Sequence, residues 1–273
     1  MTGKLYICPT PIGNLEDMTL RTIRVLREAD LIAAEDTRRT IKLLNNFEID
    51  TPMTSYHKHN LKEKGAYLID RIYGGEDVAL VSDAGMPGIS DPGQDLVRMA
   101  LDEGLEVIAL PGATASITAL VVSGINTDNF IFEGFLPSRD KDRRQRLEEI
   151  KKNRYTSIVY ESPYRIKDCL RDVLSVLGDI NIALSRELTK KYEETLRGRT
   201  SQVLAELEAR EAIKGEFVLI LETSYEEEEA SVDIGQELSR LIAAGESKSQ
   251  AVKKVSQEYG IPKNLVYKAS LDL

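Results

Sequence analysis

The chain has 273 residues, of which 42% are apolar and 30% are charged, and its formal net charge is −9. This composition excludes a disordered or fibrous chain and provides enough residues for two α/β cores. No apolar stretch reaches the length of a membrane span, and the negative charge argues against coating of nucleic acid by the whole surface. The opening sequence MTGKLYICPTP lacks the pattern of a signal peptide, so we expect a cytoplasmic protein with no membrane partner.

Short apolar runs alternate with segments of helical spacing along most of the chain, which is typical of βαβ units. The runs predicted as strands are 5–8, 30–35, 78–82, 106–110, 130–135, 157–161, 181–185 and 217–222. Between the first two runs, residues 15–29 place Leu20, Ile23 and Leu26 at near-helical spacing. We therefore predict a helix there that packs these side chains on the sheet.

Three loops that follow predicted strands are rich in glycine, proline or small residues. They are CPTPIGN at 8–14, SDAGMPGISDPG at 82–93 and PGATA at 111–115. Because ligands of α/β sheets bind at the carboxyl ends of strands, we expect these loops to converge on one cleft. Asp83 directly follows a buried strand and is a candidate acceptor for ligand hydroxyl or amine groups. The alternative is an ordinary strand-to-helix turn.

Neither the cysteines nor the histidines have the spacing of metal ligands. Cys8 and Cys169 lie in apolar contexts, which predicts buried, reduced thiols. His57 and His59 lie in YHKHN without an evident third ligand, so we expect a surface loop there, with metal binding as the weaker alternative. We expect no metal.

Charge is distributed unevenly along the second half of the chain. Residues 138–154 hold eight basic and four acidic residues, which fits either a solvated helix face or a nucleic-acid contact. Residues 226–229 are four consecutive glutamates and suggest a linker. From Gly245 to Leu273 the chain holds five basic and three acidic residues, which leaves nucleic-acid contact and a packing or dimerisation role both open.

These shifts in composition predict four parts. We expect an N-terminal α/β domain at 1–126, a second α/β domain at 127–223, an acidic linker at 224–232 and a small helical domain at 233–273. The last part reads as three short helices broken at Gly245 and at 260–262. Its spacing fits a helix-turn-helix, with Ser247 as a cap and Pro262 at the start of the final helix.

Eight sequence blocks resemble one known family in their order and spacing. They are CPTPIGNLEDMT, AEDTRRTIKLL, VSDAGMPGISDPG, PGATASITAL, FEGFLP, ESPYR, SRELTKKYEE and KGEFVLILE. Together they resemble the ribosomal RNA small-subunit methyltransferase I branch of the tetrapyrrole methylase family. The resemblance covers nearly the whole chain, including the helix-turn-helix-like tail.

The resemblance implies a fold, a methyl donor and a substrate. The expected fold is a tetrapyrrole-methylase-like α/β architecture of two domains, with S-adenosylmethionine bound in the cleft between them. The implied reaction is 2′-O-methylation of a cytidine ribose in the decoding region of 16S rRNA, within the small ribosomal subunit. A homodimer is also implied.

By position in the family pattern, nine residues resemble the donor-binding set. They are Ile12, Asp83, Met86, Pro87, Thr114, Ala115, Glu161, Leu184 and Phe217. Tetrapyrrole-modifying relatives carry a Gly-rich loop after the first strand and a Gly-Asp-Pro loop later. Here CPTPIGN and SDAG stand in their places, so the chain departs from that pattern at Pro11, Ile12 and Ala84 but keeps the acidic position at Asp83.

Methyl transfer from a sulfonium to an alcohol is an in-line displacement, so alignment of oxygen, carbon and sulfur should matter most. The hydroxyl also needs a proton acceptor or a cation that stabilises the developing alkoxide. Asp36 and Glu187 are the candidate bases, and ordinary salt bridging is the alternative for both. Arg38, Arg165 and Arg186 are candidates to hold phosphates or the alkoxide. The tyrosines at 56, 160 and 164 are candidates to stack an unpaired cytosine.

Two other functions stay open at this point. The first is a methyltransferase of a tetrapyrrole or another small molecule, with the same fold and donor. The second is a ribosome-associated RNA-binding protein without catalytic activity. The basic cluster at 138–154 and the tail favour RNA over a porphyrinoid, which needs no such electrostatic surface.

Overall fold

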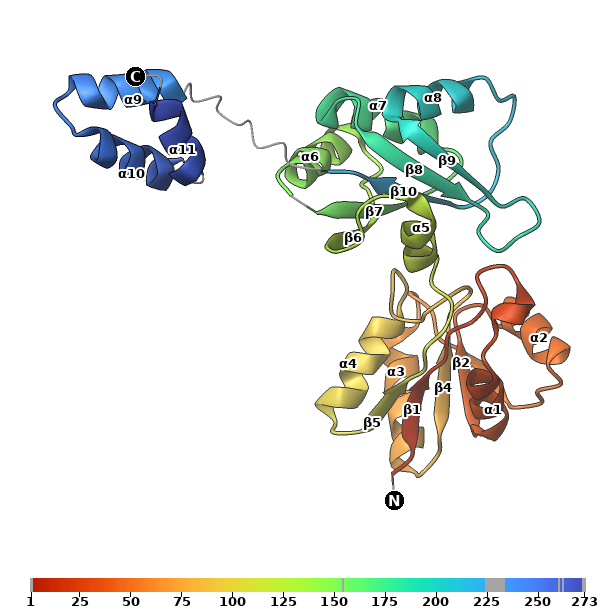
Figure 1. The fold of residues 1–273 in the computed structure, drawn as a ribbon. Helices are drawn as coiled ribbons and strands as arrows, with labels where there is room; N and C mark the ends of the chain where they lie inside the picture. Colours follow the sequence, from red (N-terminus) through yellow and green to blue (C-terminus); the bar gives the residue numbers. More distant parts are fainter. Residues whose placement is uncertain (1, 154, 224–233, 260, 262, 272–273) are drawn as a thin grey trace. The chain divides into compact units, whose positions relative to one another are not determined.

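A computed structural model of the chain describes residues 2–153, 155–223, 234–259, 261 and 263–271. Contacts divide the chain into two compact units, Met1–Ser224 and Tyr225–Leu273 (Figure 1). The first unit holds two five-stranded sheets, and the second is helical.

The first sheet is entirely parallel, in the order β3-β2-β4-β1-β5. Its strands are β1 (Lys4–Ile7), β2 (Leu31–Ala34), β3 (Met53–Ser55), β4 (Val78–Val81) and β5 (Glu106–Ala109). Helices α1 (Leu20–Glu28) and α2 (Thr37–Asn46) cover one face, and α3 (Leu61–Tyr73) and α4 (Gly93–Asp102) cover the other (Figure 1). Because both faces are buried, β2 and β4 have no exposed residue and read as continuous apolar runs.

The predicted helix at 15–29 is divided in two. Leu15–Asp17 form a 3₁₀ turn, and Thr19 then caps α1 by accepting a hydrogen bond from the Thr22 amide. The prediction that Leu20 packs on the sheet is wrong, because Leu20 is the first residue of α1 and remains 86% exposed. The buried face of the helix runs through Thr22, Val25 and Leu26 instead.

The second sheet is mixed, in the order β6-β7-β10-β8-β9. Its strands are β6 (Phe130–Phe135), β7 (Thr156–Glu161), β8 (Asn181–Arg186), β9 (Glu194–Arg199) and β10 (Phe217–Leu221), and only β6 and β7 pair in parallel. The sequence prediction missed β3 and β9. The three-residue β3 is too short for a periodic signal, and β9 is the polar run ETLRGR, held at the sheet edge by its pairing with β8.

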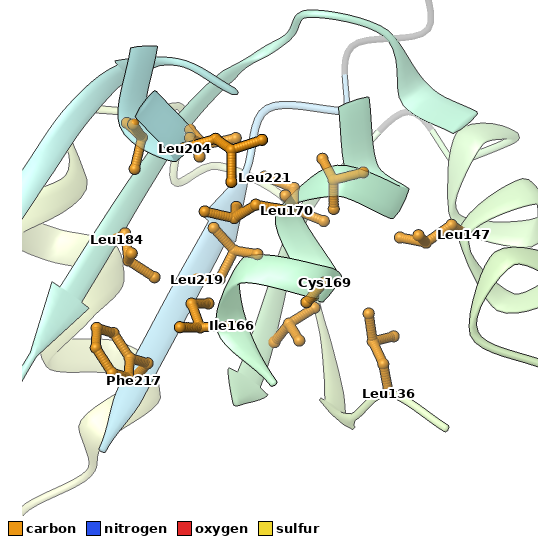
Figure 2. Packing of buried hydrophobic residues seen from close by; sticks show 14 of the residues in the cluster. Leu136, Leu147, Ile166, Cys169, Leu170, Leu184, Leu204, Phe217, Leu219 and Leu221 are labelled. Carbon is orange, nitrogen blue, oxygen red and sulfur yellow. The ribbon is translucent and has the colours of Figure 1, made fainter. Parts of the chain in front are cut away.

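Strand β10 joins the cores on the two faces of this sheet. Phe217, Leu219 and Leu221 point into the cluster formed with α6 (Asp140–Lys151), α7 (Ile166–Leu177) and α8 (Thr200–Glu208), and Figure 2 shows their packing. Val218 and Ile220 alternate with them and face the opposite cluster. This alternation is the period of two expected of a strand buried on both faces.

Helix α5 (Ala115–Ser123) follows the first sheet in sequence but packs on the second. Its buried residues Ala119 and Leu120 lie in one cluster with Ile158, Ala183 and Val218. Gly124 ends the helix with a left-handed backbone (φ 76°). The segment 110–124 therefore links the two sheets through packed side chains as well as through the chain itself.

The C-terminal unit contains α9 (Ile234–Ala243), α10 (Lys248–Glu258) and α11 (Lys263–Ser270) around a small apolar core. Ser247 is the residue that precedes α10, and its amide donates to the side chain of Gln250, as in a capping box. Gly245 takes a left-handed conformation, as its predicted role as a helix breaker requires. Pro262 and the acidic run 226–229 lie outside the described residues.

The two cysteines are buried and the two histidines lie in a loop, as predicted. Cys8 and Cys169 are free and buried, and burial raises the pKa of each thiol to about 12. His57 and His59 lie in the turn between β3 and α3. In the described ranges, no three His, Cys, Asp or Glu side chains are arranged to hold a metal ion. No helix in the described part of the chain is long and apolar enough to span a bilayer.

Helix α1 provides a matched test of the packing. Leu26→Ala should lower the free energy of unfolding by about 2–5 kcal/mol, because Leu26 is fully buried and truncation leaves a cavity. Leu20→Ala, in the same helix, should change it by less than about 0.5 kcal/mol. Urea unfolding followed by circular dichroism measures both. Equal losses from the two variants would contradict this orientation of α1.

Candidate functional site

Three loops at the carboxyl edge of the first sheet are held together by close backbone contacts. Thr10 and Gly85 exchange two amide-to-carbonyl hydrogen bonds of 2.9 and 3.0 Å, which join the loop after β1 to the loop after β4. Gly85 has φ 77°, a left-handed conformation that favours glycine. A Cβ atom at Gly112 would collide with the ring of Pro9, so the loop after β5 also lies against the loop after β1.

A pocket of about 670 Å³ lies where these loops meet the second sheet. The N-terminal half of the first unit contributes Ile12, Ala84, Gly85, Met86, Ile89, Ser90, Thr114, Ala115, Ser116 and Ile117. The second half contributes Phe130, Phe132, Phe135, Tyr160, Glu161, Ser162, Pro163, Glu187, Leu188, Lys190, Glu216, Phe217 and Val218. The lining is mostly apolar with a few charged groups, which is typical of a small-molecule site, and its volume suits a ligand of cofactor size.

The turn between β8 and β9 forms the charged wall of this pocket. Glu187 and Thr189 both have left-handed backbone conformations, with φ 51° and 67°, which non-glycine residues seldom adopt. Two glycines from other parts of the chain pack closely against this turn. A Cβ atom at Gly13 would collide with the Lys190 side chain, and a Cβ atom at Gly215 would collide with the Glu187 side chain. The Asn14 amide also donates to Thr189 Oγ1 at 3.0 Å.

Glu187 and Lys190 form the charged pair of this wall. Lys190 Nζ lies 2.9 Å from Glu187 Oε1 and 3.0 Å from Glu216 Oε2, and the Glu216 amide also donates to Glu187. Burial acts to raise the pKa of Glu187, but these hydrogen bonds outweigh it and hold the pKa below its usual value. Burial acts to lower the pKa of Lys190, and the two carboxylates reverse that effect and raise it. Both groups are therefore charged at neutral pH.

Glu161, at the end of β7, has a buried carboxylate that lines the pocket. It accepts hydrogen bonds from the Ser162 amide at 2.8 Å and from Arg165 Nη2 at 2.9 Å. Arg165 also donates to the Leu136 carbonyl at 2.7 Å. The Arg165 guanidinium therefore already bonds to Glu161 and to the Leu136 carbonyl. This arrangement fits a role for Arg165 in positioning Glu161 better than a direct contact of Arg165 with phosphate.

An aromatic wall closes the pocket beside β6 and β7. Tyr160 makes edge-on contacts with Phe132 and Phe135, with ring centroids 4.9 and 5.7 Å apart. Its hydroxyl accepts a hydrogen bond from the Ser116 amide in the first turn of α5. The other two predicted stacking tyrosines lie elsewhere: Tyr56 is buried in the core of the first sheet, and Tyr164 is 93% exposed.

The acidic residues after β2 and β4 form a separate network at the edge of the first sheet. Asp36 caps α2 and accepts two hydrogen bonds from the Arg38 guanidinium, of 3.0 and 2.7 Å. The bonds from the Arg38 side chain and amide lower the pKa of Asp36 to about 2. Asp83 accepts from the Asp36 amide and pairs with Arg39 at 3.2 Å, so it connects the two loops.

Glu35, the residue before Asp36, has the opposite tendency. Burial raises the pKa of Glu35, the Asp83 amide at 3.4 Å opposes that shift, and the neighbouring Asp83 carboxylate adds to it. Two adjacent carboxyls thus have pKa values pushed apart, as happens at many functional sites. Neither is among the residues that line the pocket.

The structure brings together seven of the predicted site residues. Those lining the pocket are Ile12, Met86, Thr114, Ala115, Glu161, Glu187 and Phe217. Those outside its lining are Asp36, Arg38, Asp83, Pro87, Arg165, Leu184 and Arg186.

Two of the predicted residues outside the lining are held elsewhere in the second half. Leu184 faces the core on the α7 side of its sheet (Figure 2). Arg186 pairs with Glu194 at 3.4 Å.

Sequence reasoning left several lining residues out of the candidate site. Lys190 and Glu216 surround Glu187, and Phe132 and Phe135 form the aromatic wall. The block SRELTKKYEE indicates that Lys190, three residues from Glu187, could face the cleft, but it assigns Lys190 no role. The phenylalanines of β6 read as ordinary strand residues, and only the fold shows that they lie beside helix α5.

The pocket between two α/β halves, with a second sheet of mixed direction, defines a particular class of fold. The sequence profile described as Tetrapyrrole (Corrin/Porphyrin) Methylases matches residues 4–204. A crystal structure of uroporphyrin-III C-methyltransferase from Thermus thermophilus, complexed with S-adenosylhomocysteine, superposes with a TM-score of 0.56 at 18% identity. The likeness covers 81% of this chain and 98% of that one, and at this identity it establishes the fold alone.

Two curated relatives are similar over nearly the whole chain. A protein of Halalkalibacterium halodurans named Ribosomal RNA small subunit methyltransferase I is 52% identical, covering 97% of this chain and 93% of its own. A Bacillus subtilis protein of the same name is 45% identical, covering 98% and 94%. The chain therefore belongs to the tetrapyrrole methylase family, in the branch that contains these relatives.

Removal of Arg38 tests the network at Asp36. In Arg38→Ala, the pKa of Asp36 should rise from about 2 toward the ordinary value of about 3.9, because the largest stabilising hydrogen bonds to the carboxylate are lost. Since the folded-state pKa is lowered, ionised Asp36 stabilises the fold above about pH 4, and this contribution disappears as the pH falls toward 2. Carboxyl NMR titration measures the shift. Arg39→Ala is the control, and an equal rise there would contradict the assignment to Arg38.

Proposed function

We propose that this protein is an S-adenosylmethionine-dependent 2′-O-methyltransferase of a cytidine in the decoding region of 16S rRNA, acting on the small ribosomal subunit in the cytoplasm. Support comes first from the relatives named Ribosomal RNA small subunit methyltransferase I, at up to 52% identity over nearly the full chain. The observation that carries the proposal within the structure is the pocket that both halves of the first unit line.

The residues around the pocket fit the methyl donor. Ile12, Met86 and Phe217 provide apolar walls for an adenine ring, and Asp83 supports the loop that presents Met86. The Ser116 amide donates to Tyr160, but Thr114 makes no side-chain cap bond, so the other amides in the first turn of α5 suit the carboxylate of the methionine moiety. When bound, the donor supplies an activated methyl group on its sulfonium. Pro87 does not line the pocket but follows Met86, which does. Leu184 stays in the proposed donor set on the family pattern alone.

The charged wall suits the acceptor hydroxyl better than the network at Asp36 does. Glu187 lies in the pocket and is ionised, so it can orient the ribose hydroxyl and accept its proton. Lys190, held beside it, places a positive charge where an alkoxide develops. Asp36 is less suited to be the base, because it lies outside the pocket lining and its carboxylate is held by the Arg38 guanidinium.

Exposed groups outside the pocket suit an RNA substrate. Arg38 pairs with Asp36 through two of its guanidinium nitrogens, but its side chain is 88% exposed and the third nitrogen can reach phosphate oxygens. Tyr164 presents an open ring for stacking. The basic cluster at 138–154 is less available, because Arg143, Arg144 and Arg146 pair with Asp172 or Glu133. Arg165 and Arg186 then act by holding Glu161 and Glu194 in place.

We also propose a homodimer. Four apolar side chains on α5 and β6 are exposed, and three of them also line the pocket: Ile117, Phe130 and Phe135 line it, and Val121 does not. Exposed apolar side chains gathered on neighbouring elements are typical of a protein interface.

Methylation of a tetrapyrrole remains the second candidate for the reaction, since a solved structure of the same fold is a uroporphyrin-III C-methyltransferase. RNA binding without catalysis is the third.

Transfer of labelled methyl groups tests the proposal. The protein, S-adenosylmethionine and small subunits that lack the modification should yield 2′-O-methylcytidine, detected by nucleoside mass spectrometry. Large subunits are the matched control and should remain unlabelled. Donor binding without any transfer to RNA, together with transfer to uroporphyrinogen, would favour the tetrapyrrole reaction. The absence of donor binding would favour the non-catalytic function.

Single-turnover rates distinguish the two candidate bases. Glu187→Gln should slow methyl transfer by about 10²-fold or more, since the proton acceptor is lost. Asp36→Asn keeps a good N-cap and should retain the rate within a few-fold. Lys190→Met should lose about 10²-fold if the ammonium stabilises the alkoxide, while Lys190→Arg recovers part of that loss. Full activity of Glu187→Gln would remove Glu187 as the base.

A further inference from the structure

The three C-terminal helices together carry a net positive charge, although the whole chain is negative. The described helices and turns of this part, 234–259, 261 and 263–271, hold six basic and three acidic residues, whereas the complete chain has a net charge of −9. Two of the three carboxylates are already paired, Glu237 with Arg240 and Glu246 with Lys254. The positive charge that is left over lies mainly on α10 and α11.

Helix α11 presents one polar face that its own unit does not cover. Val266 and Ser270 are buried against the small core, while Lys263, Asn264, Tyr267 and Lys268 are exposed. Lys263 and Tyr267 are four residues apart, and so are Asn264 and Lys268, so these two pairs lie side by side on one part of the helix surface. We call them the α11 face.

The charges of the α11 face are available to a partner. Within the described ranges, neither Lys263 nor Lys268 forms an ion pair, and α11 has no acidic residue. Tyr267 is 59% exposed between them. Two unpaired ammonium groups beside an open aromatic ring match a polyanion that also carries flat rings, which is the chemistry of a nucleic acid strand.

The same face discriminates between forms of RNA. The major groove of an A-form duplex is deep and narrow and does not admit a helix, so α11 would meet only phosphates there. In a loop, unpaired bases are open to stacking on an aromatic side chain such as Tyr267, with about 1–3 kcal/mol per base. A tyrosine between two lysines therefore favours a loop over a duplex.

We infer that the α11 face binds RNA loops, with Lys263 and Lys268 on phosphates and Tyr267 stacked on an unpaired base. This inference rests on the proposed function in that the substrate is RNA, and it assigns to the C-terminal unit a part of substrate recognition separate from the pocket. The unit then raises affinity for the substrate and leaves the transfer step itself unchanged.

Binding of the full-length protein to two RNA probes tests the inference. The probes are a stem-loop RNA and a fully paired duplex of the same length, each titrated at several salt concentrations. The wild type should bind the stem-loop more tightly. Lys263→Ala with Lys268→Ala should weaken binding to both probes and reduce the slope of log K against log salt by about 1–2. Lys62→Ala with Lys167→Ala removes the same charge from the first unit and is the control.

Substitutions at Tyr267 separate stacking from charge. Tyr267→Ala should remove about 5–100-fold of affinity for the stem-loop, with little change for the duplex, while Tyr267→Phe keeps the ring and the preference. Circular dichroism confirms that each variant is folded. Unchanged affinities and salt slopes in all variants would overturn the inference, and so would a loss of self-association instead of RNA binding. Because binding is measured without methyl transfer, failure of the proposed reaction would not be mistaken for failure of this surface.

Discussion

The pocket depends on close packing between two glycines and one turn. Gly13 arrives from the first half and Gly215 from the second, and neither leaves room for a Cβ atom against the turn at 187–190. That turn holds Glu187 and Thr189 in conformations that they would not adopt unsupported. The loops after β1 and β4 are hydrogen-bonded to each other, and the loop after β5 packs on the first of them through Gly112 and Pro9, so these loops hold the apolar wall in place.

In the first unit, some charged side chains are held in ion pairs within the protein and others are free to contact a substrate. Most arginines named by sequence reasoning hold carboxylates of the same unit, as Arg165 holds Glu161 and Arg186 holds Glu194. Among the described residues that line the pocket, Lys190 is the one cation, and it is shared by two carboxylates. An acidic chain can thus act on a polyanion if its few uncommitted cations are placed where the substrate meets it.

Much of the fold could be predicted from the sequence, because strands buried on both faces produce continuous apolar runs. The family followed from eight blocks in order, and the comparisons confirm it. The sequence did not predict which residues lie together on each wall of the pocket. Leu20 has the right spacing but lies at the first position of its helix, and α5 packs on the second sheet although it follows the first. Such outcomes depend on long-range packing, which local periodicity does not encode. The roles of the site residues remain predictions.

The order of strands in the second sheet also bears on how the protein is made. Strand β10 is the last strand in the sequence, yet it lies between β7 and β8 at the centre of the sheet. During synthesis, β7 and β8 therefore leave the ribosome before β10 does. Until β10 emerges, each of them has unpaired backbone groups along one side. Pairings of this non-local kind form slowly, and exposed strand edges favour aggregation. The nascent chain can complete its pocket only after residues 217–221 have emerged, so it should need protection until nearly all of the first unit has been translated.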